Sequence, residues 1–188
     1  MAVMAGIYTF RMEAVFPVFK RHFNILKFLK ELDWFNKLSL AFLITFILTN
    51  LIGTLAPSLV VDDLRYHFAI PKRYVEAGAI TYIPDIEFSN FPFPMEMLWT
   101  LAISIDSGAL AQLINWSIGL LGIGWIVILG NKSGLQTALT VLPVSLFYSI
   151  TTVGAISRSG LVELGGVLFF LAGIYLIIEY KEFGEQKL

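Results

Sequence analysis

The chain has 188 residues, of which 57% are hydrophobic and only 14% charged, and its mean hydropathy is +0.77. Soluble domains carry about a quarter charged residues, so this composition predicts a membrane protein. A net charge of −1 offers no basic surface to a nucleic acid, and the lack of cysteine excludes disulfides and thiolate metal sites.

The N-terminal segment, residues 1–37, is predicted to be cytoplasmic or interfacial and amphipathic. It lacks the basic start and the cleavage site of a secretory signal, so we expect it to be retained. Across residues 14–36, phenylalanines and leucines recur at three- and four-residue steps, with basic residues between them. This pattern is typical of a helix on an anionic membrane surface, or of a helix packed against the rest of the protein.

Four apolar segments are predicted to cross the membrane, within a membrane domain that covers residues 38–180. Each approaches the ~20 residues that a bilayer core requires. Pro143 lies inside the third segment and predicts a kink there. The sequence therefore predicts an all-α polytopic membrane protein with about four transmembrane helices. The predicted spans are residues 38–57, 109–129, 135–152 and 161–178.

Basic residues predict the orientation of the chain. Six of them precede the first span, against three acids. The positive-inside rule then places the N-terminus in the cytoplasm, and four spans return the tail, residues 181–188, to the same side. We expect an integral protein of the cytoplasmic membrane with both termini inside.

The loop over residues 58–106 is then expected to lie outside and to carry short interfacial helices. Its chemistry is unusual for a connection, because charges, prolines and aromatic residues are concentrated in it. Gly78 is placed to end a helix that starts near Pro71. The apolar run 95–105 is too short to cross and is expected to rest at the outer interface. A second outer turn is predicted over residues 154–160.

Two acids come a few residues beyond the end of the first span. Asp62 or Asp63 can act as a general base toward a hydroxyl, can hold a divalent metal, or can cap a short helix. Asp63 and His67 are four residues apart and would share a helix face, so a carboxylate can orient the imidazole. The alternative for His67 is a hydrogen-bonded surface residue.

Cationic and aromatic side chains are further candidates. Four cations can neutralise a lipid-linked phosphate, or contact lipid headgroups: Arg65, Lys72, Arg73 and Arg158. Arg158 and Glu163 lie between apolar spans, where charge tends to mark function. The loop aromatics can anchor it at the interface or stack on a sugar. They are Tyr66, Tyr74, Tyr82, Phe88, Phe91, Phe93 and Trp99.

The order of residues in the loop resembles that of bacterial polytopic glycosyltransferases of the GT-C fold, relatives of protein O-mannosyltransferases and aminoarabinose transferases. The resemblance covers roughly residues 38–180. After the loop it continues through Lys132, Pro143 and Thr151-Thr152. Within the loop it rests on an acid after the first span, then Tyr66-His67, Pro71, Tyr74, Gly78, Pro84, Phe91-Pro92 and Glu96-Met97-Leu98.

This resemblance implies transfer of a sugar from a polyprenyl-phosphate carrier to an acceptor on the non-cytoplasmic side. It assigns the base to Asp63, or second to Asp62. No cofactor is expected beyond a divalent metal, which the two acids themselves could hold. Relatives have more spans, so a second chain supplying them is an expected partner besides the bilayer. The alternative function is a non-catalytic membrane subunit that uses the loop for partner or lipid contact. A small transporter is a weaker possibility, since no internal repeat is present.

Overall fold

The computed structural model describes residues 25–185 except residues 92 and 106, and the described chain is helical without a strand. The predicted all-α polytopic membrane protein is therefore confirmed. The helices are α3 (Ile25–Glu31), α4 (Trp34–Thr54), η2 (Asp63–His67), α5 (Ala69–Ala77), η3 (Glu87–Asn90), α6 (Pro94–Ile105), α7 (Gly108–Lys132), η4 (Thr137–Thr140), α8 (Val141–Ser149), α9 (Thr151–Ser157) and α10 (Glu163–Glu185).

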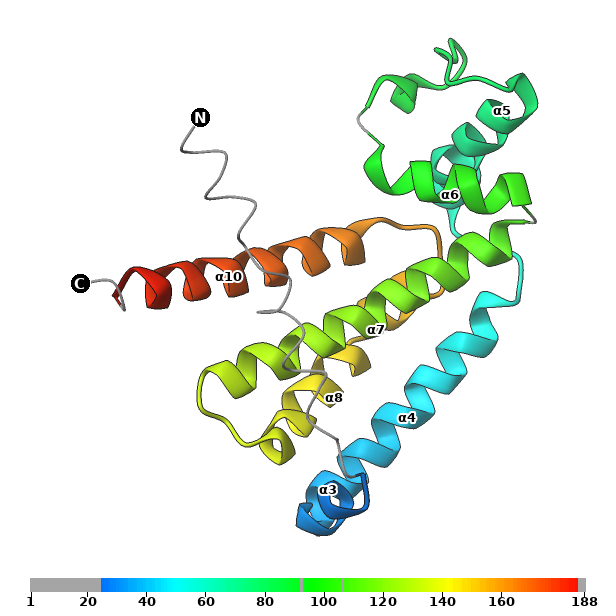
Figure 1. The fold of residues 1–188 in the computed structure, drawn as a ribbon. Helices are drawn as coiled ribbons and strands as arrows, with labels where there is room; N and C mark the ends of the chain where they lie inside the picture. Colours follow the sequence, from blue (N-terminus) through cyan, green and yellow to red (C-terminus); the bar gives the residue numbers. More distant parts are fainter. Residues whose placement is uncertain (1–24, 92, 106, 186–188) are drawn as a thin grey trace.

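Three of these helices, α4, α7 and α10, are long and apolar enough to cross a membrane. At 1.5 Å per residue, the 21 residues of α4 reach about 32 Å, close to the ~30 Å of a hydrocarbon core. Figure 1 shows α7 running between α4 and α10, and it contacts both. The three helices with α8 and α9 form a bundle.

The third predicted span corresponds to a bent pair, in which η4 and α8 meet α9 at 74°, the geometry of a broken span or of a re-entrant loop. The break lies at Ile150, whose ψ of 121° takes it out of helical geometry. The predicted kink at Pro143 is wrong, because this proline occupies the first turn of α8, where a missing N–H costs little. The second predicted turn is also too long, since Gly154 lies within α9.

The N-terminal prediction is corrected where the structure describes it. A single helix through residue 36 is wrong, because α3 stops at Glu31 and Asp33 begins α4. The Asp33 carboxylate accepts a hydrogen bond from the amide of Asn36 at 2.8 Å, as an N-cap does. Residues 1–24, with most of the predicted amphipathic pattern, lie outside the described residues.

The described residues between 58 and 107 fold into a cap at one end of the bundle, built from η2, α5, η3 and α6 (Figure 1). The cap has its own small core of Ile70, Tyr74 and Ile83. Gly78 ends α5 with a φ of +64°, as its position in the sequence predicts. At 12 residues, about 18 Å, α6 is too short to cross a bilayer.

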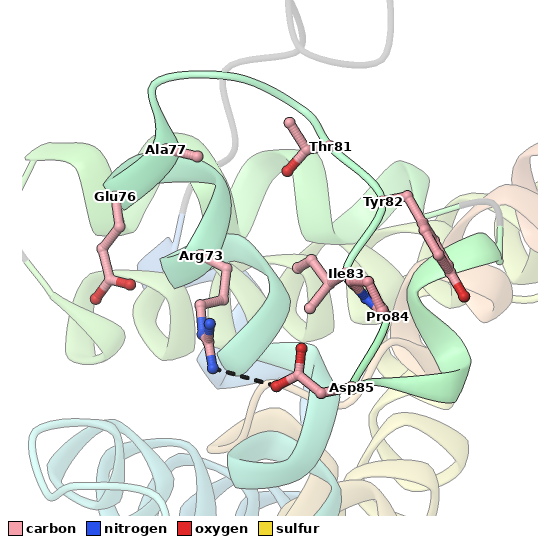
Figure 2. Close-up of a pocket in the computed structure, with 8 residues that line it drawn as sticks. All are labelled: Arg73, Glu76, Ala77, Thr81, Tyr82, Ile83, Pro84 and Asp85. Atoms are coloured by element: carbon pink, nitrogen blue, oxygen red, sulfur yellow. Dashed lines mark hydrogen bonds and ion pairs between the residues drawn. The ribbon is translucent and has the colours of Figure 1, made fainter.

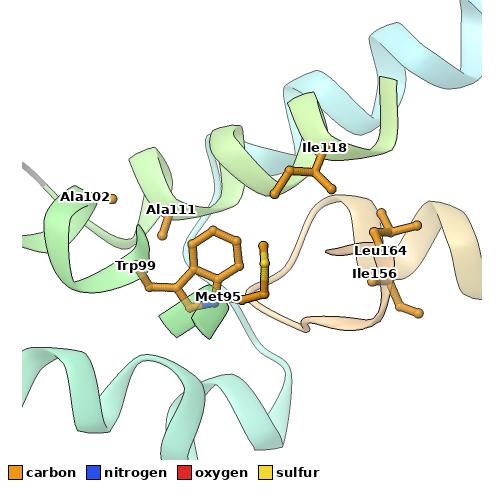
Figure 3. Close-up of a cluster of buried hydrophobic side chains, with 7 residues drawn as sticks. All are labelled: Met95, Trp99, Ala102, Ala111, Ile118, Ile156 and Leu164. Atoms are coloured by element: carbon orange, nitrogen blue, oxygen red, sulfur yellow. The ribbon is translucent and has the colours of Figure 1, made fainter. Parts of the chain in front are cut away.

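A second hydrophobic cluster joins the cap to the bundle (Figure 3). The indole of Trp99 is fully buried in it, so this residue is neither an interface anchor nor a platform for a sugar. Through this cluster α6 is packed on three helices of the bundle. Its members are Met95, Trp99 and Ala102 of α6 with Ala111, Ile118, Ile156 and Leu164.

The opposite end of the bundle is closed by polar contacts. Lys132 of α7 and Glu179 of α10 form an ion pair at 2.7 Å. Ser145 of α8 donates a hydrogen bond to the carbonyl of Ser39 in α4 at 3.0 Å. The start of α4 and the end of α10 therefore lie on the face of the bundle away from the cap (Figure 1).

Candidate functional site

Asp63 is the most constrained of the predicted site residues. It opens η2, a single π-helical turn in which the Phe68 amide bonds to the Asp63 carbonyl at 2.8 Å. Its side chain is fully buried, and Oδ2 accepts hydrogen bonds from the Gly160 amide at 2.8 Å and from the Ser58 hydroxyl at 2.5 Å. Helix capping is therefore not its role, and the Asp62 side chain does not cap η2 either.

The second carboxylate oxygen of Asp63, Oδ1, is buried and has no hydrogen-bond partner among the described residues. Burial raises the pKa of Asp63 above its usual range, although the Gly160 amide, the Ser58 hydroxyl and nearby His67 act in the opposite direction. The outcome is a carboxylate more basic than a free aspartate, fixed through one oxygen with the other unused.

Gly160 is the anchor that holds Asp63 in place. Its carbonyl accepts a hydrogen bond from the Trp99 indole at 2.9 Å, so both its backbone polar groups bind the cap. The ring of Phe68 covers its α-carbon so closely that a Cβ would lie 2.3 Å from a ring carbon. A side chain at this position would have to displace the Phe68 ring.

Asn115 of α7 holds the same turn from the bundle side. Its amide nitrogen lies 2.8–2.9 Å from three backbone carbonyl oxygens, those of Ile156, Ser159 and Leu161. Sequence reasoning missed Ser58, Gly160 and Asn115. The signal that could have identified Asn115 is a polar residue inside an otherwise apolar span.

His67 is paired with a different carboxylate from the predicted one. Its Nδ1 lies 2.7 Å from Oε1 of Glu96 on α6, and both side chains are buried. The predicted orientation of His67 by Asp63 is therefore corrected to orientation by Glu96. This pair ties η2 to α6 inside the cap.

Acids from three parts of the chain act on the pKa of Tyr66. Its pKa is raised, first by burial and then by Asp62, Glu163 and Glu96. The phenol therefore stays protonated at physiological pH and acts as a hydrogen-bond donor. Within the described part of the chain, no three acid or histidine side chains are grouped so that they could hold a metal ion.

Two of the predicted cations are engaged at the surface of the cap. Arg65 pairs with Glu87 at 3.1 Å and Arg73 with Asp85 at 3.3 Å, and all four side chains are exposed. Such exposed pairs contribute at most about 1 kcal/mol. Lys72 is exposed on α5 as well. The structure does not bring these cations to Asp63.

The Arg73–Asp85 pair lines an open hollow of about 360 Å³ on the cap (Figure 2). None of the residues around Asp63 contributes to it. The hollow is therefore a surface feature distinct from the Asp63 site. Its lining is Arg73, Glu76, Ala77, Thr81, Tyr82, Ile83, Pro84 and Asp85.

Arg158 lies closer to the Asp63 site, in the turn between α9 and α10, and is exposed. Its aliphatic stem crosses Gly53 in the last turn of α4. Glu163, in the first turn of α10, is exposed too, and no ion pair joins it to Arg158. The same turn carries Gly160, whose amide binds Asp63.

The site thus holds three groups of acid–base chemistry: a buried carboxylate with a raised pKa, an imidazole paired with a carboxylate, and a protonated phenol. Comparison of the chain with protein families, with curated proteins and with solved structures finds no match. Its function is therefore inferred from the chemistry of these residues.

Proposed function

We propose that the chain is a GT-C-like membrane glycosyltransferase, or the cap-bearing module of one. It would transfer a sugar from a polyprenyl-phosphate carrier to an acceptor hydroxyl on the non-cytoplasmic side of the cytoplasmic membrane. The observation that carries this proposal is Asp63, a buried carboxylate with one oxygen fixed by Gly160 and Ser58 and the other unpaired among the described residues.

In the proposed reaction, Oδ1 of Asp63 takes the proton of the acceptor hydroxyl while the acceptor oxygen attacks the anomeric carbon. The bond from that carbon to the phosphate oxygen breaks, and the carrier phosphate leaves with the electron pair. Displacement from the opposite face inverts the anomeric centre. The raised pKa of Asp63 suits this role, because a more basic carboxylate accepts the proton more readily.

The surroundings of Asp63 have supporting roles in this proposal. Gly160 and Ser58 hold Oδ2, so that Oδ1 keeps one direction. The pair of His67 and Glu96 fixes the η2 turn against α6. Since Oδ1 is closed to solvent, substrate binding must open the cap at this point. A second chain that supplies further spans is a proposed partner.

A non-catalytic membrane subunit is the second candidate, and it is favoured by the same hydrogen bonds. Asp63 links the cap to the turn after α9, 97 residues later in the chain. A residue that served only to staple the two parts together would make these bonds as well. The two candidates differ in what happens when the charge of Asp63 is removed and its shape is kept.

The first prediction is that Asp63→Asn lowers sugar transfer by about 10²–10⁴-fold, the usual contribution of a general base. Its amide oxygen can still accept the hydrogen bonds from Gly160 and Ser58, so folding and donor binding should survive. The measurement is transfer from a radiolabelled polyprenyl-phosphate sugar, by the chain alone or with its partner. Asp62→Asn is the matched control and should retain turnover.

Two results would contradict this assignment. Loss of folding and donor binding together in Asp63→Asn would make the residue structural and favour the non-catalytic subunit. Full turnover in Asp63→Asn with loss in Asp62→Asn would move the base to the neighbouring acid.

The second prediction concerns pH. Because the base must be ionised, transfer should rise as the pH increases through the raised pKa of Asp63, so the acid limb should lie above the range of an ordinary aspartate. The rate profile of the wild type, with Asp62→Asn beside it, measures this. If the rate instead rose over the pH range of a free aspartate, burial would not raise the pKa of the catalytic base.

A further inference from the structure

Arg158 stands apart from the other arginines that the structure describes. Arg65 and Arg73 each pair with a carboxylate on the cap surface. Arg158 is exposed and makes no ion pair with any described residue. Its guanidinium therefore retains its five donors for a ligand outside the chain.

The side chain of Arg158 packs against the last turn of α4. Its Cδ lies so close to Gly53 that a Cβ at that glycine would be 2.9 Å away. Gly53 is the penultimate residue of α4, and α4 matches the thickness of the hydrocarbon core. In a bilayer that α4 spans, Gly53 would lie at one end of the hydrocarbon core, and Arg158 beside it would lie at the level of the lipid phosphates.

We propose that Arg158 binds the phosphate group of a lipid, while the aliphatic part of its side chain packs against Gly53. The planar guanidinium suits bidentate contact with phosphate oxygens. The lipid is a membrane phospholipid or, resting on the proposed function, the polyprenyl carrier. In the second case one turn supplies both the cation for the phosphate and, through the amide of Gly160, the support of Asp63.

A purely structural role for Arg158 would require only a positive charge at this position. A cation at the C-terminal end of α9 would be stabilised by the helix dipole, and lysine would serve equally well. Bidentate binding of phosphate needs the guanidinium, so lysine would replace arginine poorly. The Arg158→Lys variant separates the two roles.

The test is lipid binding by the purified full chain in detergent, followed by native mass spectrometry. The probes are a C55 polyprenyl phosphate, phosphatidylglycerol, and the uncharged polyprenol. We expect Arg158→Ala to weaken binding of phosphate-bearing lipid at least about tenfold and Arg158→Lys several-fold, with polyprenol unaffected. Lys37→Ala, an equal charge change at the far end of α4, should leave binding unchanged.

Gly53 offers an independent test that keeps the charge. Gly53→Ala displaces the Arg158 stem and should weaken phosphate-lipid binding, whereas Gly124→Ala, in an open place on α7, should not. Thermal unfolding of each variant identifies any that is misfolded.

Each outcome has a defined meaning. Loss confined to polyprenyl phosphate supports the proposal with the carrier as the lipid, and equal loss for phosphatidylglycerol supports it with membrane phospholipid. Unchanged binding in folded Arg158→Ala overturns it, as does full binding in Arg158→Lys together with no effect of Gly53→Ala. None of these readings requires sugar transfer, so the failure of the proposed function would be seen separately in the Asp63→Asn assay.

Discussion

At the scale of single residues, Gly160 is the position of the site that leaves least room for a side chain. Its amide binds Asp63, its carbonyl binds Trp99, and Phe68 fills the space over its α-carbon. A methyl group there must displace an aromatic ring that is itself packed against the turn. Overpacking of this kind costs about 1–3 kcal/mol.

We therefore predict that Gly160→Ala lowers the free energy of unfolding by about 1–3 kcal/mol and weakens the hydrogen bond from the amide of residue 160 to Asp63. Gly166→Ala is the matched control, because its Cβ would meet nothing within 4 Å and alanine favours a helix. Thermal unfolding in detergent measures both. Equal stability of the two variants would mean that Phe68 moves aside at no cost.

The candidate site was predictable from the sequence only in part, and the division follows the range of the contacts. Asp63 is recognisable because it lies a few residues beyond an apolar span. Its partners were not, because Gly160 lies 97 residues away and contributes a backbone amide, which any residue but proline carries. His67 was paired with a local acid, whereas Glu96, 29 residues on, is its partner.

At the scale of elements, the bend between α8 and α9 is set by Ile150 and not by the proline. Pro143 lies in the first turn of α8, so it removes no hydrogen bond that the helix would otherwise make. A proline that made a kink in a helix interior would cost ~3 kcal/mol or more.

We predict that Pro143→Ala changes stability by less than about 1 kcal/mol and leaves the bend as it is. Spin labels at Leu139 and Thr152, both exposed, report the geometry across the bend. An unchanged distance distribution between them is the expected result. A clear lengthening of that distance would return the bend to Pro143.

The helices themselves were predictable because long apolar runs admit few other structures in a membrane. Their ends were less so. The first span begins at Trp34, earlier than predicted, because Asp33 is the N-cap residue of α4 and separates this helix from α3. The bend at Ile150 carries no local signal, since isoleucine is common in both helices and extended segments.

At the scale of the whole molecule, the cap and the turn after α7 lie at opposite ends of the bundle. The cap is predicted to face the non-cytoplasmic side, so a residue in the α7–η4 turn should face the cytoplasm. Thr81 of the cap and Ser133 after α7 are both exposed, and the chain has no cysteine of its own.

We predict that Thr81→Cys reacts with an impermeant thiol reagent on intact cells, whereas Ser133→Cys reacts only after permeabilisation. The physical reason is the excess of basic residues before α4. The reverse labelling pattern would invert the orientation, and with it the side on which the proposed transfer takes place.

The double attachment of Gly160 also governs the order in which the protein can mature during synthesis. The cap residues Asp63 and Trp99 are made 97 and 61 residues before the glycine that they bind. At about 5–20 residues per second, Asp63 is added to the chain roughly 5–20 s before Gly160. A nascent chain that stops before Gly160 would therefore leave Asp63 without one of its two donors. The cap can close only after the bent pair of α8 and α9 has been made.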